Sequence, residues 1–237
     1  MHPYLLRDRS IEILFALCMA SAFVTYLFAY SISKDDLLLM AVQSVNMSLI
    51  PQLNLIFPVA LMTVVMMGPA LLPGATHVAA NSFYWRKKRA VTYYCFSYLA
   101  CWTVASWTTM AFIMNLRAFL TSYQIAGLFF AGASIWQISE AKRISLAKCH
   151  KSIPLVPRGF KADLSCIAFG STNGWACLMS CWPFMSAIMA LPQFLVFSMP
   201  ISAVYVVAER RSDPNKNLLS KSGMIMAVVA VILVLPT

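Results

Sequence analysis

The fold of this chain is set by the stretch Arg86-Lys87-Lys88-Arg89 and the uncharged run 91–114 that follows it, VTYYCFSYLACWTVASWTTMAFIM. An α-helix rises about 1.5 Å per residue, so a run of this length can cross a hydrocarbon core of about 30 Å. A block of cations at one end of an apolar run is typical of the cytoplasmic end of a membrane helix. The stretch therefore predicts a transmembrane helix.

Further apolar runs on both sides predict more helices of the same kind. All but the last reach the length of about 20 residues that a membrane-spanning helix needs. We therefore expect an all-α, polytopic transmembrane helix bundle of about seven spans, or six if the first or the last run is not a full span. The predicted spans are 11–30, 53–73, 91–114, 118–138, 164–185, 188–208 and 222–236.

The basic residues sort to one side of these spans. With a cytoplasmic N-terminus, 16 of the 18 Lys and Arg residues fall in cytoplasmic segments, and only Lys34 and Arg117 lie outside. The positive-inside rule therefore predicts an N-in, multi-pass protein of the cell inner (cytoplasmic) membrane. The longest cytoplasmic segment, 139–163, has room for a short interfacial helix but not for a domain of its own. The whole chain, 1–237, is predicted to be a single membrane domain.

The composition excludes several classes of protein. Sixty per cent hydrophobic residues, 11% charged residues and a mean hydropathy of +0.73 do not suit a soluble domain. The net charge of +10 is spread over loops without a nucleic-acid-binding motif, so the expected partner is the lipid bilayer and not nucleic acid. No paired carboxylates, hydrolase triad or phosphate loop is present, and His is scarce. We therefore expect a protein that is not an enzyme.

A column of sulfur side chains stands out in the fifth predicted span, where residues 170–185 read GSTNGWACLMSCWPFM. Cys177, Cys181 and Met185 repeat every four residues and so share one face of a helix. Thiolates and thioethers are soft ligands that suit Cu(I), and thiolates also suit zinc. Met66 and Met67 in the second span offer possible facing ligands. The sequence thus predicts a soft-metal site, with copper as the expected metal.

The same residues also allow a purely structural interpretation. Gly170 and Gly174 form a small-residue motif that lets membrane helices pack closely, and Asn173 lies on the face of the sulfur column. Free Cys and Met are also ordinary packing residues in a helix bundle. In the basic loop, Cys149-His150 is either a second soft-metal site or part of a solvated face. Both interpretations remain open at this point.

Four sequence elements resemble a bacterial family of predicted metal-binding integral membrane proteins, a domain of unknown function. The resemblance covers about residues 55 to 235 and is most specific around the Cys/Trp/Met stretch. It departs from the family pattern at Ser180, where the family often has another Cys, and at Gly68 and Pro183. The elements are Met66-Met67-Gly68-Pro69, Trp136-Gln137 with Lys148-Cys149-His150, Gly174-x-x-Cys177-x-x-x-Cys181-Trp182-x-x-Met185, and Glu209-Arg210.

Two classes of function follow from these observations. The first is a membrane protein that binds or handles copper at the Cys/Met column, as the resemblance also implies. The second is a non-catalytic structural or accessory subunit of a larger membrane complex, such as a respiratory, photosynthetic or copper monooxygenase assembly. In the second case other membrane subunits are the partners, and the sulfur column serves helix packing alone.

Overall fold

The computed structural model describes residues 56–149, 151, 153–156, 158–191, 194–211 and 218–234, and the regular elements in this part of the chain are all helical. The predicted all-α class is therefore confirmed for these residues, while the predicted span 11–30 lies outside them. The helices are α4 (Ile56–Ala80), the 3-10 helix η1 (Tyr84–Arg86), α5 (Lys87–Leu116), α6 (Ser122–Gln137), α7 (Glu140–Cys149), α8 (Phe160–Met189), α9 (Leu195–Arg211) and α10 (Leu218–Val234).

The number of membrane spans is not established by these helices. Two described segments, Met62–Ala80 and Tyr84–Leu116, are long and apolar enough to cross a membrane. Helices α6, α9 and α10 have 16, 17 and 17 residues, fewer than the roughly 20 that a straight crossing needs. Helix α8 has 30 residues, but Ser, Thr and Asn side chains interrupt its apolar sequence. Each of the six predicted spans after the first overlaps a described helix, so these helices are confirmed and the number of membrane spans stays a prediction.

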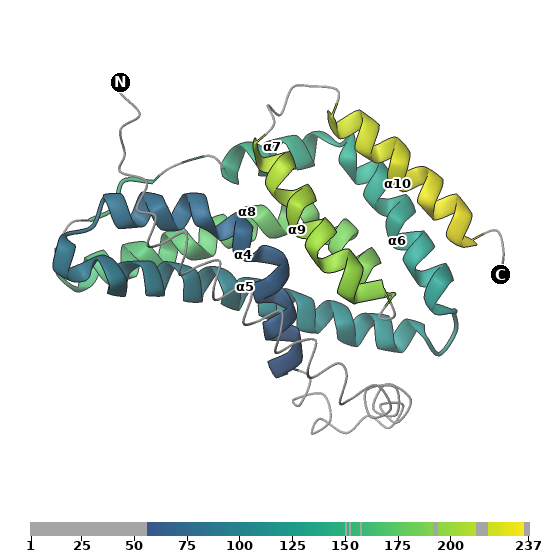
Figure 1. Cartoon of the computed structure of the whole chain (residues 1–237), viewed down its shortest axis with the longest axis horizontal. Coiled ribbons are helices and arrows are strands. Elements are labelled where there is room, and N and C mark those ends of the chain that lie inside the picture. The colour runs from purple at the N-terminus through teal and green to yellow at the C-terminus, as the bar shows by residue number, and fades with distance from the viewer. Residues whose placement is uncertain are drawn as a thin grey trace.

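Helix α8 lies at the centre of the molecule (Figure 1). It packs most extensively against α5, and it also contacts α6 and α7. Helix α4 covers α5 and meets α9, while α6 and α10 pair at the opposite end. Helix α4 bends along its length (Figure 1), as expected for a helix that contains Pro69 and Pro73, because proline removes a backbone hydrogen-bond donor.

Local sequence signals explain where some of these helices begin. Thr121 and Gln124 form a reciprocal capping box at the start of α6, with each side chain bonded to the other residue's backbone N–H. Helix α8 follows Gly159, whose φ of +78° lies in the left-handed region that glycine adopts without strain. These two signals set where α6 and α8 begin.

Glycines allow α8 to approach α5 closely. A Cβ atom added at Gly170 would lie 2.5 Å from the backbone oxygen of Tyr94, and one at Gly174 would lie 3.2 Å from that of Tyr98. The first distance is shorter than any ordinary contact. The close approach brings the side chains of α5 directly against the sulfur column of α8.

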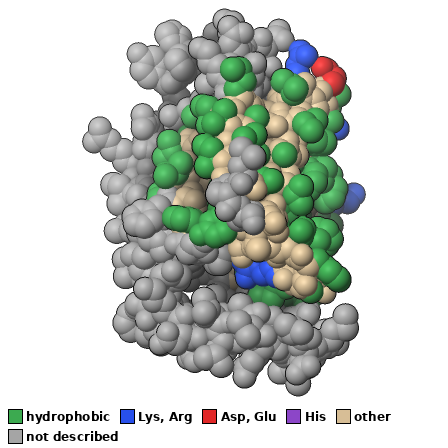
Figure 2. Space-filling view, turned by 90° about the vertical axis from the view of Figure 1, so that its right-hand side faces the viewer, with side chains coloured by type: hydrophobic (Ala, Val, Ile, Leu, Met, Phe, Trp, Pro, Cys, Tyr) green, Lys and Arg blue, Asp and Glu red, His purple; other side chains and the backbone are tan. Residues whose placement is uncertain are grey.

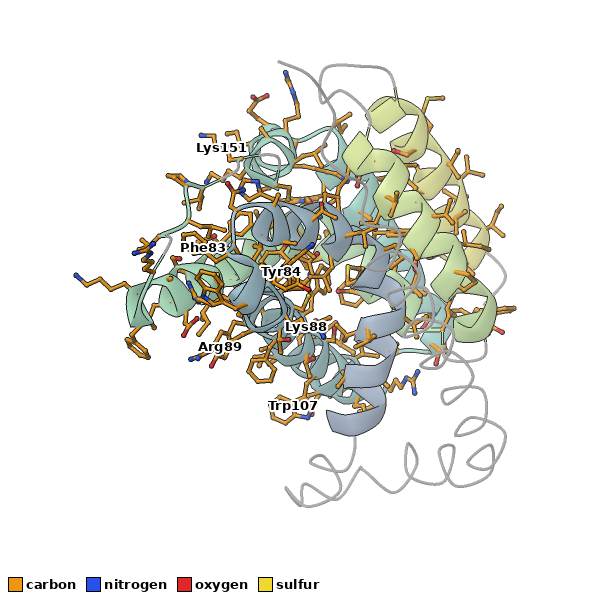
Figure 3. The ribbon with its side chains drawn as sticks, turned by 60° about the vertical axis from the view of Figure 1, so that its left-hand side comes forward. Phe83, Tyr84, Lys88, Arg89, Trp107 and Lys151 are labelled. Carbon is orange, nitrogen blue, oxygen red and sulfur yellow. The ribbon has the colours of Figure 1, made fainter. Side chains whose placement is uncertain are left out.

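Two arginines tie the start of α5 to the start of α8. Arg86 Nη2 lies 2.5 Å from Asp163 Oδ1, and Arg89 Nη2 lies 2.7 Å from Asp163 Oδ2. The aromatic side chain of Tyr84 is exposed just before this clamp, and Figure 3 shows it at the same turn as Arg89. The basic turn that precedes α5 and the first turn of α8 therefore lie at the same end of the molecule.

Large apolar side chains cover much of the outer surface. Figure 2 shows the face on the side of α6 and α10, where hydrophobic side chains outnumber charged ones over the described residues. Large exposed apolar patches mark surfaces that contact another protein or a membrane. On α6 and α10 the exposed large apolar residues are Tyr123, Leu128, Ile135, Met224, Ile225, Val228, Val231, Ile232 and Val234.

Candidate metal centre

The sulfur column of α8 is buried. Cys177, Cys181 and Met185 have exposed fractions of 0%, 3% and 4%, and they follow one another at successive turns near the middle and second half of the helix. The thiols of Cys177 and Cys181 lie within hydrogen-bonding reach of each other. The structure therefore brings together the two thiols that the spacing predicted to share a face.

Helix α5 places two hydrogen-bond donors beside the Cys177 thiol. The Tyr98 hydroxyl and the Trp102 indole N–H are buried, and within the described part of the chain no acceptor lies in standard hydrogen-bonding geometry to either of them. Both lie beside the Cys177 sulfur. Buried donors are normally paired, so two orphaned donors beside one sulfur suit an acceptor that is stronger than a neutral thiol. A thiolate, free or bound to a metal, is such a group.

The positively charged guanidinium of Arg210 also lies near the thiols. Arg210, from the end of α9, donates from Nη1 to the backbone oxygen of Ala70 at 2.5 Å and from Nη2 to Asn173 Oδ1 at 3.5 Å. Asn173 in turn donates to the Tyr94 hydroxyl at 2.6 Å. The guanidinium interacts electrostatically with Cys177 and with the other two thiols near it, those of Cys149 and Cys181. The sequence predicted Arg210 in a cytoplasmic segment; in the structure its side chain is partly buried.

A buried ion pair borders the same site. Lys142 Nζ lies 2.6 Å from Glu209 Oε1, with side-chain exposures of only 2% and 3%. Gln137 Nε2 donates to the same Glu209 oxygen at 2.8 Å and to Ser222 Oγ at 2.7 Å. The pair lies close enough to Cys181 to act on it electrostatically. The sequence placed Lys142 in the cytoplasmic segment 139–163, where nothing local distinguishes it from the other cations.

The structure places Cys149 near the sulfur column. This thiol ends α7 and interacts with Arg210 and Cys177. Burial raises the pKa of the Cys149 thiol to about 11, so it is neutral at physiological pH. Its predicted neighbour His150 lies outside the described residues.

Met66 and Met67 are buried in the same apolar core as the sulfur column. Helices α4 and α8 run antiparallel here, because the His77 and Phe169 rings are in contact while a Cβ at Gly74 would lie 3.1 Å from Asn173 Nδ2. Continued along both helices, this register predicts that Met66 lies level with Cys181. The bend of α4 falls between these contacts and the two methionines, so the facing role of Met66 and Met67 stays a prediction.

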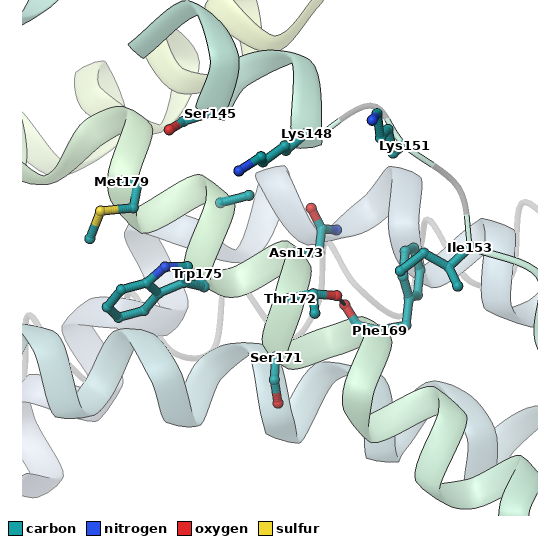
Figure 4. A pocket seen from close by; sticks show the side chains of 11 residues that line it. Ser145, Lys148, Lys151, Ile153, Phe169, Ser171, Thr172, Asn173, Trp175 and Met179 are labelled. Atoms are coloured by element: carbon teal, nitrogen blue, oxygen red, sulfur yellow. Dashed lines mark hydrogen bonds between the residues drawn. The ribbon is translucent and has the colours of Figure 1, made fainter. Parts of the chain in front are cut away.

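A surface hollow of about 510 Å³ lies between α7 and α8, beside the buried site. Figure 4 shows Lys148 and Lys151 over this hollow, with Asn173 and Trp175 on the α8 side. Asn173 also bonds to Arg210, so its side chain connects the hollow with the polar groups around the thiols. The two thiols themselves are not among its lining residues.

The donor set suits a soft monovalent ion best. Over the described residues, no three side chains of the His, Cys, Asp or Glu types are grouped closely enough to hold a metal ion. A site here would therefore consist of the two α8 thiolates, with the Met185 thioether as a weaker third donor. Two thiolates are a sufficient coordination set for Cu(I), whereas zinc sites are almost always four-coordinate. On its own residues this centre fits Cu(I).

A buried thiol pair with two orphaned donors beside it is compatible with a soft-metal site. The family of PpoB2 copper chaperones matches residues 59–233. The match spans well over half of the sequence, so this chain belongs to that copper chaperone family. No curated protein and no solved structure matches the chain. Family membership supports copper as the metal, and of the two predicted classes of function it favours copper handling.

Proposed function

We propose that this chain is a membrane-embedded copper chaperone, not an enzyme, that carries Cu(I) as cargo between Cys177 and Cys181. The observation that carries the proposal is the buried thiol pair with two orphaned donors and an arginine around it. Its membership of a copper chaperone family supports the choice of cargo.

The site residues have distinct roles in this proposal. Cys177 and Cys181 lose their protons to solvent as two S–Cu bonds form, so the cation is held by two thiolates. Met185 adds a weaker contact one turn further along α8. Tyr98 and Trp102 donate to the Cys177 sulfur and stabilise its negative charge. Low coordination leaves the ion open to an incoming thiol, which allows its transfer to a recipient by ligand exchange.

The surface supports a location in the lipid bilayer. Large apolar side chains are exposed on several helices, and two described segments meet the length and hydropathy needed to cross a membrane. Exposed aromatic rings and cations gather at the turn between α4 and α5, as at a membrane interface. The charge bias of the sequence supports a cytoplasmic side for this turn. We propose a multi-pass protein of the cell inner membrane on these grounds.

The proposed topology predicts which positions an impermeant reagent can reach. A membrane-impermeant maleimide added to intact cells should fail to label Lys88→Cys, in the turn before α5, until the membrane is permeabilised. Ala118→Cys, in the opposite turn after α5, should be labelled without permeabilisation. Both positions are exposed, and the labelling of the unmodified chain gives the background of its native thiols. Labelling of Lys88→Cys in intact cells would contradict the N-in topology.

Copper content tests the proposed function directly. We expect the full chain, purified in detergent under reducing conditions from copper-supplied cells, to carry one Cu(I) per chain by elemental analysis. A high-affinity Cu(I) chelator should remove it, and added Cu(I) should restore it, because a cargo site must exchange its ion. A chain that contains no copper, does not take up Cu(I), and elutes in fixed ratio with other membrane subunits would support the accessory-subunit alternative instead.

A further inference from the structure

The centre contains one positive charge that no described carboxylate balances. The buried cation Lys142 is paired with Glu209, and Arg86 and Arg89 share Asp163. Arg210 forms no ion pair with a carboxylate in the described part of the chain. Its hydrogen bonds go to neutral oxygens, and its Nε is buried without a partner there.

A partly buried charge without a counter-charge is costly, so an anion belongs beside Arg210. Its contact with Asn173, one turn before Cys177 on α8, places the guanidinium near the thiols of Cys149, Cys177 and Cys181 and the Tyr98 hydroxyl, with which it interacts electrostatically. Among these, the α8 thiols are the pair that faces the orphaned donors. We therefore expect the balancing anion to be a thiolate of Cys177 or Cys181, either free or bound to a metal ion.

The charge of the loaded site depends on the cation it holds. Two thiolates with one monovalent ion carry one net negative charge, which the single positive charge of Arg210 neutralises. Two thiolates with one divalent ion are already neutral, so Arg210 would then remain as an uncompensated buried cation. The adjacent Lys142–Glu209 pair is neutral as a unit and does not change this balance.

We propose that Arg210 is a specificity-determining residue that makes the Cys177/Cys181 site selective for soft monovalent cations over soft divalent ones. The inference rests on the proposed function, because it takes the α8 thiols as the binding site. Arg210 does not bind the ion; it acts through the thiolates as their counter-charge. The guanidinium is fixed for this role by its bonds to α4 and α8 through Ala70 and Asn173.

Competition titrations with Ag(I) and Cd(II) test this inference on the full chain in detergent. Both ions prefer sulfur, and neither changes oxidation state during the titration, so they report charge selectivity. For Arg210→Gln we expect the affinity for Ag(I) to fall at least about 30-fold, the smaller loss expected when one partner of a buried charge pair is removed. The affinity for Cd(II) should stay unchanged or rise. Arg210→Lys should keep most of the preference for Ag(I), because it keeps the charge.

Matched variants separate the possible outcomes. Lys88→Gln removes one exposed cation far from the thiols and should leave both affinities unchanged. If Arg210→Gln does not fold by circular dichroism and gel filtration, Arg210→Met replaces it as an uncharged side chain of similar length. An unchanged Ag(I) to Cd(II) preference in the uncharged variants, or a lost preference in Arg210→Lys, would overturn the role of Arg210 alone. Ag(I) binding that survives in Cys177→Ser/Cys181→Ser would overturn both this role and the proposed site.

Discussion

Replacing Cys177 and Cys181 together by serine is expected to abolish Cu(I) binding while the helical fold is retained. A hydroxyl is a hard ligand that stays protonated at neutral pH, so the variant lacks both anionic soft donors. Oxygen is only slightly smaller than sulfur, so the buried positions leave no large cavity. The affinity for Cu(I) is measured by competition with a chromogenic chelator, and the helical content by circular dichroism.

Two comparisons make this result specific to the α8 pair. Cys95→Ser/Cys101→Ser removes two half-buried thiols of α5 and should leave binding intact. Met185→Leu should weaken binding, by about tenfold or less, because a thioether is a neutral donor that only supplements two thiolates. If the Cys177→Ser/Cys181→Ser variant binds Cu(I) as tightly as the unmodified chain, the sulfur column is a packing feature and the metal lies elsewhere.

The sequence predicted the helices and the sulfur column because both depend on local periodicity. An apolar run long enough to fill several turns predicts a helix wherever it lies, and Cys177 and Cys181 share a face of any helix that contains them. The resemblance of the Cys/Trp/Met stretch to a metal-binding family points to metal independently of this periodicity. Membership of a copper chaperone family confirms the copper-related part of that prediction.

The polar surroundings of the thiols could not be predicted in the same way. Lys142 and Arg210 belong to basic segments in which each cation looks equivalent, and charge sorting treats all of them as solvated. Their burial depends on partners from distant parts of the chain, such as Glu209 for Lys142 and Ala70 for Arg210. The one available signal was Glu209-Arg210 itself, since the resembling family carries an acidic and a basic residue there.

The orphaned donors of α5 were equally hidden. Tyr98 and Trp102 read as ordinary aromatic residues of a membrane helix, and only the close approach of α5 to α8 directs them at Cys177. That approach depends on Gly170 and Gly174, which the sequence identified as a packing motif without identifying the helix on the other side. A motif on one helix thus defines a surface, whereas the partner that meets it is set by the whole bundle.

The second large effect is expected at the ion pair that borders the thiols. Lys142 and Glu209 are almost fully enclosed, so neither charge can be hydrated when the other is lost. Removing one partner of a buried pair costs about 3–5 kcal/mol, because the remaining charge stays buried without compensation. Glu209 also accepts a hydrogen bond from Gln137, which links it to α6 and, through Ser222, to α10.

Glu209→Gln should therefore lower the free energy of unfolding by about 3–5 kcal/mol, measured by reversible denaturation in detergent. Lys142→Met should cost a similar amount, and the double variant should cost less than the sum of the two, because it leaves no buried charge behind. Glu140→Gln is the matched control: its pair with Arg143 is exposed, and such pairs contribute about 1 kcal/mol or less. Equal effects of Glu209→Gln and Glu140→Gln would show that Lys142 reaches water. Lys142 and Glu209 would then not form a neutral buried pair beside Cys181. Arg210 would in that case not carry the only unbalanced charge among the described residues of the centre.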